Sequence, residues 1–367
     1  MTSILVVGAG LLGASVAYEA SLAGADVAVV DRGRPGGGTS GSSFSWVNAQ
    51  DKSPDAYFKL NRAGMDAYPA LAAKLGGDWF HPVGDIVIGR GPGVARVDER
   101  IERSQARGYP VARLDRAAIA DLESDLRLDD DEVVGAHFPA ESWIDAPTLV
   151  GRLLTAGGPS GSPRLLSGDV TTILVRDGRA HGVMTADGVL IETDLIVIAA
   201  GPATEGLVAT AGVHVPMAPT PGLLVITHPI SATIGHVLHT GEAAIRPDGE
   251  GRLMLSSRAI DATLDPGDVS LPSDAEPVRA VVERAERLIP SVGQAGIASV
   301  KIGIRSVPAD GQPAAGPAPG IEGLYVLASH SGATLAPVLG RLVASELVGT
   351  HEPKLDPYRL DRFVVAG

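Results

Sequence analysis

The sequence predicts an α/β fold with two lobes, and three observations carry that prediction. The chain opens with an apolar strand, a glycine-rich turn, a helix and a second strand that ends in an acid. A second all-apolar run, residues 195–200, ends in small side chains, and residues 214–305 are mostly strand-like. With 367 residues, the chain is long for a single hydrophobic core, so two lobes are the default.

The first 31 residues have the pattern of a dinucleotide-binding unit. The apolar run 4–7 predicts a strand buried on both faces, and it leads straight into Gly8-Ala9-Gly10-Leu11-Leu12-Gly13. Glycines at these spacings allow a tight turn, a close approach of the backbone to a pyrophosphate, and close packing of the helix on the strand. Asp31 ends the second strand and is placed to accept hydrogen bonds from a ribose 2′-OH. The motif by itself fits a nicotinamide or a flavin dinucleotide.

A polar loop follows the second strand. Residues 32–48 combine many glycines and hydroxyl side chains, which can wrap a polar ligand with N–H and O–H donors. The loop also contains two aromatic residues, which would be costly in a mobile surface loop, so we favour a loop that contacts the ligand. The residues expected there are Arg32, Thr39, Ser40, Ser43, Phe44, Ser45 and Trp46.

The rest of the chain alternates between helical and strand patterns. Helical spacing predicts helices over residues 53–75, 94–107, 116–124 and 275–288, and others that begin near residues 146 and 333. Alternating runs predict strands at 84–88, 170–175 and 179–185, and a buried strand precedes the small residues Ala199-Ala200-Gly201. A strand that returns to the dinucleotide sheet needs small residues where its backbone passes the ligand.

Composition excludes several classes of function. The net charge of −13 argues against nucleic acid and anionic membrane surfaces as partners. The sequence has no cysteine, which rules out disulfides, thiolate metal sites and thiol nucleophiles. No metal site is expected, because the acidic run 129–132 lacks the ligand spacing of a calcium loop and the pair His236 and His239 has no third ligand. No apolar stretch is long enough to span a membrane, and the N-terminus lacks a basic leader, so we expect a cytoplasmic protein.

These motifs resemble the FAD-dependent oxidoreductase family of D-amino-acid oxidase, glycine oxidase and monomeric sarcosine oxidase. The resemblance follows the whole chain, and its most specific parts are Gly-x-Arg at 303–305, Pro-x-Asp-Gly at 308–311 and the segment 330–337. It implies FAD rather than a nicotinamide. Its further cofactor contacts would be Val170 beside the adenine, Ala200 and Gly201 in the second small-residue motif, and Gly332, Ala333, Thr334 and Leu335 at the flavin.

The resemblance also implies how the chain is divided. A Rossmann-like FAD-binding domain of the glutathione-reductase type would be assembled from residues 1–80, 140–213 and 306–367. A mainly antiparallel β domain with flanking helices, residues 81–139 and 214–305, would bind the substrate. The ring of the flavin would lie between the two domains, with its pyrimidine edge over the N-terminus of the last helix.

The implied reaction is oxidation of a C–N bond. Hydride passes from the carbon beside the nitrogen of an amine or amino acid to flavin N5, the imine is hydrolysed, and O₂ or another acceptor reoxidises the flavin. Arg305 would bind a substrate carboxylate, although it could instead tie the lobes together through a carboxylate of the protein. Strand alternation places Lys301 on the same side, as a pocket residue or a solvated charge. His330 would bond substrate or flavin, or be structural, and Asn48 falls near the position of a carboxylate-binding arginine in sarcosine oxidase.

Departures from the family leave alternatives open. Tyrosine is absent from residues 110–324, and either His236 or His239 could line the pocket in its place. Without cysteine, FAD should be non-covalent unless a histidine carries it, and residues 218–299 contain no lysine for oxygen activation. The protein could therefore be an oxidase, a secondary- or tertiary-amine dehydrogenase with a bulkier substrate, or an electron-transfer subunit of a complex. A homo-oligomer is possible.

Overall fold

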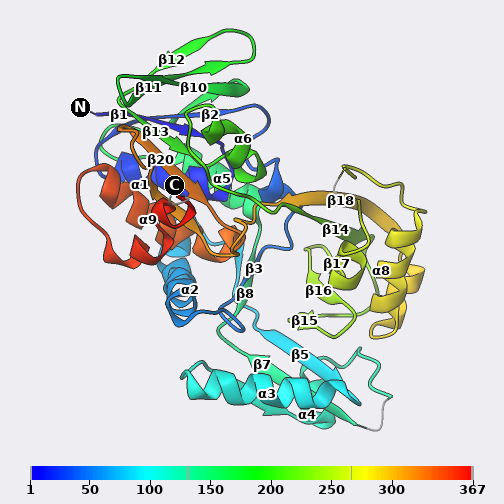
Figure 1. The fold of residues 1–367 in the computed structure, drawn as a ribbon. Coiled ribbons are helices and arrows are strands. Elements are labelled where there is room, and N and C mark those ends of the chain that lie inside the picture. The colour runs from blue at the N-terminus through cyan, green and yellow to red at the C-terminus, as the bar shows by residue number, and fades with distance from the viewer. Residues whose placement is uncertain (1, 130–131, 266, 365–367) are drawn as a thin grey trace.

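Two large β-sheets organise the protein, and the chain passes between them several times (Figure 1). The structure is a computed structural model that describes residues 2–129, 132–265 and 267–364. Part of the acidic run 129–132 therefore lies outside the described residues. Two smaller sheets, of three strands each, complete the strand content of the described chain.

The first large sheet is mostly parallel. Its order is β19-β20-β13-β1-β2-β9, and every neighbouring pair is parallel except β19 with β20. Ile4 and Val6 belong to one hydrophobic core and Leu5 and Val7 to another, so β1 is buried on both faces, as its apolar run predicts. The strands are β1 (Ser3–Val7), β2 (Asp26–Asp31), β9 (Arg164–Ser167), β13 (Leu195–Ile198), β19 (Ala314–Pro317) and β20 (Leu324–Ala328).

Helices cover one face of this sheet and a small sheet with a short helix covers the other. The first face carries α1 (Leu11–Leu22), α2 (Asp55–Leu75), α5 (Ala146–Thr155) and α9 (Gly332–Leu347). The second face carries α6 (Thr204–Ala209) and the antiparallel strands β10 (Val170–Arg176), β11 (Arg179–Thr185) and β12 (Leu190–Glu192). This arrangement of layers is the expected one for a dinucleotide-binding sheet.

The second large sheet is mainly antiparallel. Its order is β18-β14-β17-β16-β15-β5-β7-β6, and only β15 with β5 is a parallel pair. Its strands are β5 (Asp85–Arg90), β6 (Ala112–Leu114), β7 (Val133–Phe138), β14 (Thr220–Thr227), β15 (Val237–His239), β16 (Ala244–Pro247), β17 (Leu253–Ser256) and β18 (Ile297–Arg305). The helices of this lobe are α3 (Gly93–Ala106), α4 (Arg116–Leu122), α7 (Arg258–Asp261) and α8 (Glu276–Glu286). Figure 1 shows β14 and β18 reaching from the first lobe into the second.

The predicted fold class is confirmed, since a Rossmann-like parallel sheet and a mainly antiparallel sheet are both present. The first sheet takes its strands from residues 3–31, 164–198 and 314–328, and the second from residues 85–138 and 220–305. The exact domain boundaries stay a prediction. A small antiparallel sheet of β3 (Trp46–Val47), β8 (Ser142–Ile144) and β4 (Phe80–His81) lies where the chain leaves one lobe for the other.

The polar loop after β2 is packed directly on β18. The Thr39 hydroxyl donates a hydrogen bond of 2.6 Å to the carbonyl of Ile304. A Cβ added to Gly303 would lie 2.3 Å from the carbonyl oxygen of Ser42, so only glycine allows this approach. The loop that the sequence assigns to the ligand is therefore held against a strand of the second lobe.

The N-terminal end of α9 is fixed by α2. The Tyr57 hydroxyl lies 2.6 Å from the hydroxyl of Ser331, and the Tyr68 hydroxyl donates to the carbonyl of Ala333. A Cβ on Gly64 would lie 2.3 Å from the carbonyl oxygen of Thr334. The two helices are in backbone contact at the point where α9 begins.

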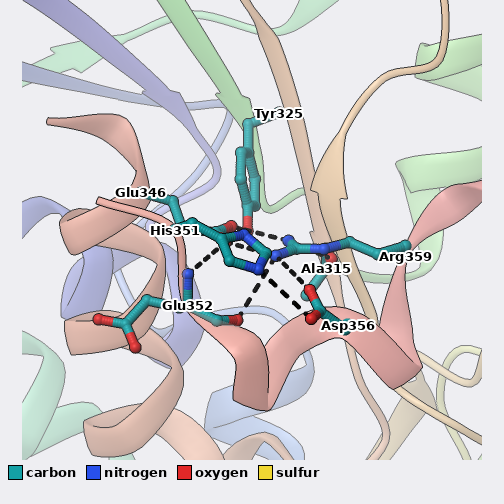
Figure 2. Close-up of polar contacts among 7 residues, drawn as sticks. All are labelled: Ala315, Tyr325, Glu346, His351, Glu352, Asp356 and Arg359. Atoms are coloured by element: carbon teal, nitrogen blue, oxygen red, sulfur yellow. Dashed lines mark hydrogen bonds and ion pairs between the residues drawn. The ribbon is translucent and has the colours of Figure 1, made fainter. Parts of the chain in front are cut away.

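The other end of α9 is held by a cluster of charged side chains (Figure 2). The Glu346 carboxylate accepts hydrogen bonds from the hydroxyl of Tyr325 on β20, at 2.6 Å, and from the Arg359 guanidinium. It also accepts from the backbone N–H of Glu352, at 3.1 Å. These bonds tie α9 to the sheet and to the C-terminal segment, so both ends of the helix are positioned by side chains from other elements.

We expect Gly64→Ala to destabilise the protein by about 1–3 kcal/mol. The new methyl group would clash with the backbone of α9, which cannot move aside as a flexible side chain could. It should also reduce the FAD retained per chain, since the start of α9 shifts. Thermal unfolding and the flavin content after purification measure both effects. Gly151→Ala is the matched control, because a Cβ there meets nothing within 4 Å in another helix; it should be neutral or stabilising. Equal unfolding midpoints for the two variants would contradict the packing argument.

Candidate active site

A cavity of about 2630 Å³ lies between the two lobes and runs along the first turns of α1 and α9. Pockets for small ligands usually measure about 300–1,000 Å³, so this one has room for a dinucleotide together with a substrate. The predicted site residues that line it are Gly8, Ala9, Gly10, Leu11, Leu12, Asp31, Arg32, Thr39, Ser40, Ser43, Phe44, Ser45, Trp46, Asn48, Val170, Ala200, Gly201, Arg305, His330, Gly332, Ala333 and Thr334.

Three predicted site residues lie outside the cavity lining. Gly13 instead packs α1 on β1, since a Cβ there would lie 1.9 Å from the carbonyl oxygen of Gly8. The Leu335 side chain is fully buried in the core. Lys301 donates to the carbonyl of Gly41 at 3.2 Å, so its ammonium holds the polar loop on β18.

The N-terminus of α1 presents backbone donors to the cavity. Its N-cap residue, Gly10, has no side chain that could cap the helix, and the Ser40 hydroxyl from the polar loop accepts from the N–H of Leu11 at 3.0 Å. The Asp31 carboxylate accepts from the N–H groups of Ala9 and Gly33, at 2.7 and 2.8 Å, at the end of β2. The remaining N–H groups of the first turn have no partner within the helix and suit a phosphate.

The N-terminus of α9 also lacks a side-chain cap. The N–H groups of Thr334 and Leu335, which we expected to face the flavin, both donate to the carbonyl of Ser331, because that carbonyl closes the first turn. The N–H groups of Gly332 and Ala333 precede these bonds and have no intrahelical acceptor. The first turns of α1 and α9, which both lie along the cavity, therefore keep backbone N–H groups available for a ligand.

Arg305 lines the cavity but already has protein partners. Its guanidinium donates to the carbonyl of Pro221 at 2.6 Å and forms an ion pair with Asp261 on α7. Asp261 is 5% exposed and also accepts from the N–H of Leu223, at 2.8 Å. Arg305 remains 32% exposed. The carboxylate that pairs with Arg305, that of Asp261, therefore belongs to the same lobe as Arg305. This ion pair does not tie the two lobes together.

Several basic residues that the sequence reasoning did not select line the same cavity, and two of them, Lys52 and Arg258, lie near His330. The Lys52 ammonium donates to the Ser331 hydroxyl at 3.1 Å, and burial lowers its pKa to about 8. Arg258 begins α7, a helix in a region predicted to be mostly strand. Neither residue belongs to a recognisable motif. The one signal in the sequence was that Lys52 lies four residues after Asn48, a predicted site residue.

His330 lies among these basic groups. Burial, followed by the positive charges of Lys52, Arg305 and Arg258, lowers the pKa of His330 to about 4. The imidazole is therefore neutral at neutral pH, with one nitrogen able to donate and the other able to accept. Asn48 also contacts the start of α9, where its backbone N–H donates to the Thr334 hydroxyl at 3.1 Å.

A buried acidic network lies behind one wall of the cavity. His239 lines the cavity and packs against Trp46, with ring centroids 4.1 Å apart and the rings tilted by 36°. Its Nδ1 lies 2.6 Å from a carboxylate oxygen of Asp85. The Gln50 amide donates at 2.9 Å to both Asp85 and Glu141, which are fully buried. His236 is bound to a different acid, Glu123, and is not part of the cavity lining. Of the two histidines considered, His239 is the one that the fold brings to the pocket.

A model of the family described as FAD dependent oxidoreductase matches residues 3–346. The chain belongs to this family. It is 27% identical to glycine oxidase of Geobacillus kaustophilus (strain HTA426) over 98% of this chain and 97% of that protein. It is 26% identical to D-amino acid dehydrogenase of Xanthobacter autotrophicus (strain ATCC BAA-1158 / Py2), with 96% of each chain covered.

Solved structures show the same fold. Glycine oxidase from Geobacillus kaustophilus superposes with a TM-score of 0.88 at 23% identity, with 100% of both chains covered. Iminodiacetate oxidase from Chelativorans sp. BNC1 gives a TM-score of 0.84 at 24% identity over 97% of this chain and 98% of that chain. No helix in the described residues is long and apolar enough to cross a membrane. Among those residues, no group of three or more His, Asp or Glu side chains is placed to hold a metal ion.

The residues present fit FAD, the cofactor of the family. The first turn of α1, with Gly10 at its N-cap, offers for a pyrophosphate the N–H groups that Ser40 does not bind, and Asp31 stands at the end of the neighbouring strand for a ribose. The uncapped first turn of α9 offers N–H donors and a helix dipole for a group that gains negative charge. Bound FAD supplies a two-electron acceptor for hydride.

The buried carboxyl group of Glu141 gives a test of the acidic network that it forms with Gln50 and Asp85 behind the cavity. Burial and the nearby charge of Asp85 raise the pKa of Glu141 to about 8. The unfolded chain releases this proton near pH 4.5 and the folded chain near pH 8, so the stability contributed by Glu141 is full below pH 4.5 and is lost as the pH rises through 8. Glu141→Gln should remove that loss.

We therefore expect the unfolding midpoint of Glu141→Gln, relative to the parent protein, to rise steadily between about pH 5 and pH 8. Thermal unfolding in a series of buffers measures the difference. Glu99→Gln, which changes an exposed residue of α3, is the control and should follow the parent at every pH. A midpoint difference that stays constant with pH would show that Glu141 is ionised in the folded protein.

Proposed function

We propose that the protein oxidises the C–N bond of an amine or amino acid that carries a carboxylate, with O₂ or another acceptor reoxidising non-covalently bound FAD. The single observation that carries the proposal is the positive wall beside the start of α9. Arg305, Lys52 and Arg258 meet there around a neutral histidine, in a chain whose net charge is −13. Such a wall attracts an anionic substrate to the end of the cavity where the flavin is expected.

Arg305 is the residue that we propose to bind the carboxylate. A guanidinium has five N–H donors, and the contacts with Pro221 and Asp261 leave donors available for a substrate. The pair with Asp261 holds the planar group in one orientation, which favours two parallel hydrogen bonds to a carboxylate. The side chain of Asp261 thus acts through Arg305 and does not itself contact the substrate.

The polar groups around Arg305 can position the amine. The neutral imidazole of His330 can accept a hydrogen bond from the amine nitrogen, and the Asn48 side chain borders the same part of the cavity. Hydride can leave the carbon only when the nitrogen holds a free lone pair, so the amine reacts in its neutral form. The positive charges of Lys52 and Arg258 favour that form, since they repel an ammonium.

The names of relatives agree with this class of substrate. The related proteins are called glycine oxidase, D-amino acid dehydrogenase and iminodiacetate oxidase, and each acts on a carboxylate-bearing amine by its name. They include oxidases and a dehydrogenase, so both kinds of electron acceptor are compatible with the fold. The experiment below separates an oxidase from a dehydrogenase by the reaction of the reduced flavin with O₂.

The proposal predicts bleaching of the oxidised flavin when the purified protein is mixed anaerobically with carboxylate-bearing amines, and none with amines that lack a carboxylate. Arg305→Ala and Arg305→Lys should raise the half-saturating substrate concentration by on the order of 30-fold or more, because an ammonium cannot replace the guanidinium fork. The flavin content per chain should stay unchanged. Acid precipitation should release the flavin into solution, as expected for non-covalent FAD.

Arg176→Ala is the control, since Arg176 is an exposed arginine of β10 outside the cavity lining. The flavin of this variant should be reduced with the same dependence on substrate concentration as the flavin of the parent protein. Bleaching by carboxylate-free amines, or an unchanged half-saturation in both Arg305 variants, would overturn the assignment of Arg305. Bleaching by substrate without reaction with O₂ would identify a dehydrogenase.

A further inference from the structure

Helix α7 brings two guanidinium groups to one wall of the cavity. Arg258 and Asp261 are three residues apart on this single turn, so they lie on the same side of the helix. Asp261 pairs with Arg305 of β18, and both arginines line the cavity. The ion pair therefore fixes the turn that carries Arg258 next to the residue proposed to bind the substrate.

The charges of this wall do not balance within the protein. Asp261 neutralises Arg305. Arg258 is exposed toward the cavity and has no carboxylate partner in the part of the chain that the structure describes. Lys52 donates to the neutral Ser331 hydroxyl. Of the acids closest to Lys52, Asp51 is paired with Arg100 and Arg103, and Glu141 keeps its proton below about pH 8.

The pKa values of the neighbouring groups agree with this placement of the cations on one wall of the cavity. The charges of both Lys52 and Arg258 lower the pKa of His330, and the charge of Arg258 lowers the pKa of Lys52. Like charges held close together repel each other, and a bound anion relieves that repulsion. Below about pH 8, the three cations Lys52, Arg258 and Arg305 and the carboxylate of Asp261 leave two positive charges on this wall, counted over the described residues.

We propose that the substrate carries two acidic groups, and that Arg258, with Lys52 beside it, binds the second while Arg305 binds the first. The substrate class is then an amino or imino dicarboxylic acid, whose two negative charges match the two unbalanced cations. This inference rests on the proposed oxidation of a carboxylate-bearing amine. Arg258 determines specificity, because a substrate with one carboxylate leaves its guanidinium without a partner.

Matched substrates test the proposal in the FAD-loaded protein. Anaerobic flavin reduction is compared for aspartate against alanine and for iminodiacetate against N-methylglycine, which differ mainly in the second carboxylate. The quantity compared is the rate of flavin reduction divided by the apparent Kd. In whichever pair reacts with the parent protein, this ratio should be on the order of 30-fold or more higher for the dicarboxylate. Arg258→Met should bring that preference close to one by weakening dicarboxylate binding. Arg258→Lys should restore part of it.

Arg284→Met is the matched control, because Arg284 of α8 lines the same cavity and its loss removes the same charge at a different place. It should keep the dicarboxylate preference, and all variants should keep the parent's flavin content. Equal reduction by mono- and dicarboxylates, or an Arg258→Met variant with the parent's preference, would overturn this inference while leaving the proposed function intact. Loss of FAD from Arg258→Met would make Arg258 a cofactor residue and overturn it as well. Failure of the whole panel to reduce the flavin would overturn the proposed function itself.

Discussion

The close packing of α9 against α1 and α2 is the constraint on which the rest of the site depends. A Cβ on Gly340 would lie 2.7 Å from Ser15 of α1, and a Cβ on Gly64 would lie 2.3 Å from the backbone of α9. Because both contacts require glycine, the start of α9 has one position relative to the sheet. The Ser331 hydroxyl at that helix end contacts both the Tyr57 hydroxyl and the Lys52 ammonium, so the ammonium is placed relative to α9.

The second lobe takes its position from the same region. The polar loop, residues 32–48, begins at the end of β2 and reaches in space to the start of α9. Between these points it is held on β18 by the hydrogen bonds of Thr39 and Lys301. Asn48, at the end of this loop, donates its backbone N–H to Thr334. One segment thus joins the cofactor side of the cavity to the strand that carries Arg305. A change in the loop would move both walls together.

Electrostatics at the cavity differs from that of the protein as a whole. The chain carries a net charge of −13, yet the wall near His330 carries two cations that no carboxylate in the described part of the chain balances. The acids that could neutralise them are occupied or protonated: Asp261 holds Arg305, and burial keeps the proton on Glu141. The fold thereby keeps a local positive charge within an acidic protein, which is what recognition of an anionic substrate requires.

The sequence by itself determined the fold class, the family and most of the cofactor side of the site, because these depend on local patterns. Glycine spacing, an apolar strand and an acid at a fixed distance are contiguous in the chain, and the structure brings them to the cavity as β1, α1 and Asp31. Arg305 was found in the same way, through a short motif. Only the tertiary structure decided that Asp261 pairs with Arg305 and that Lys52, Arg258 and His239 reach the cavity. Those residues come from separate segments with no motif of their own, and their proximity depends on how two sheets and a four-residue helix pack, which no local pattern records.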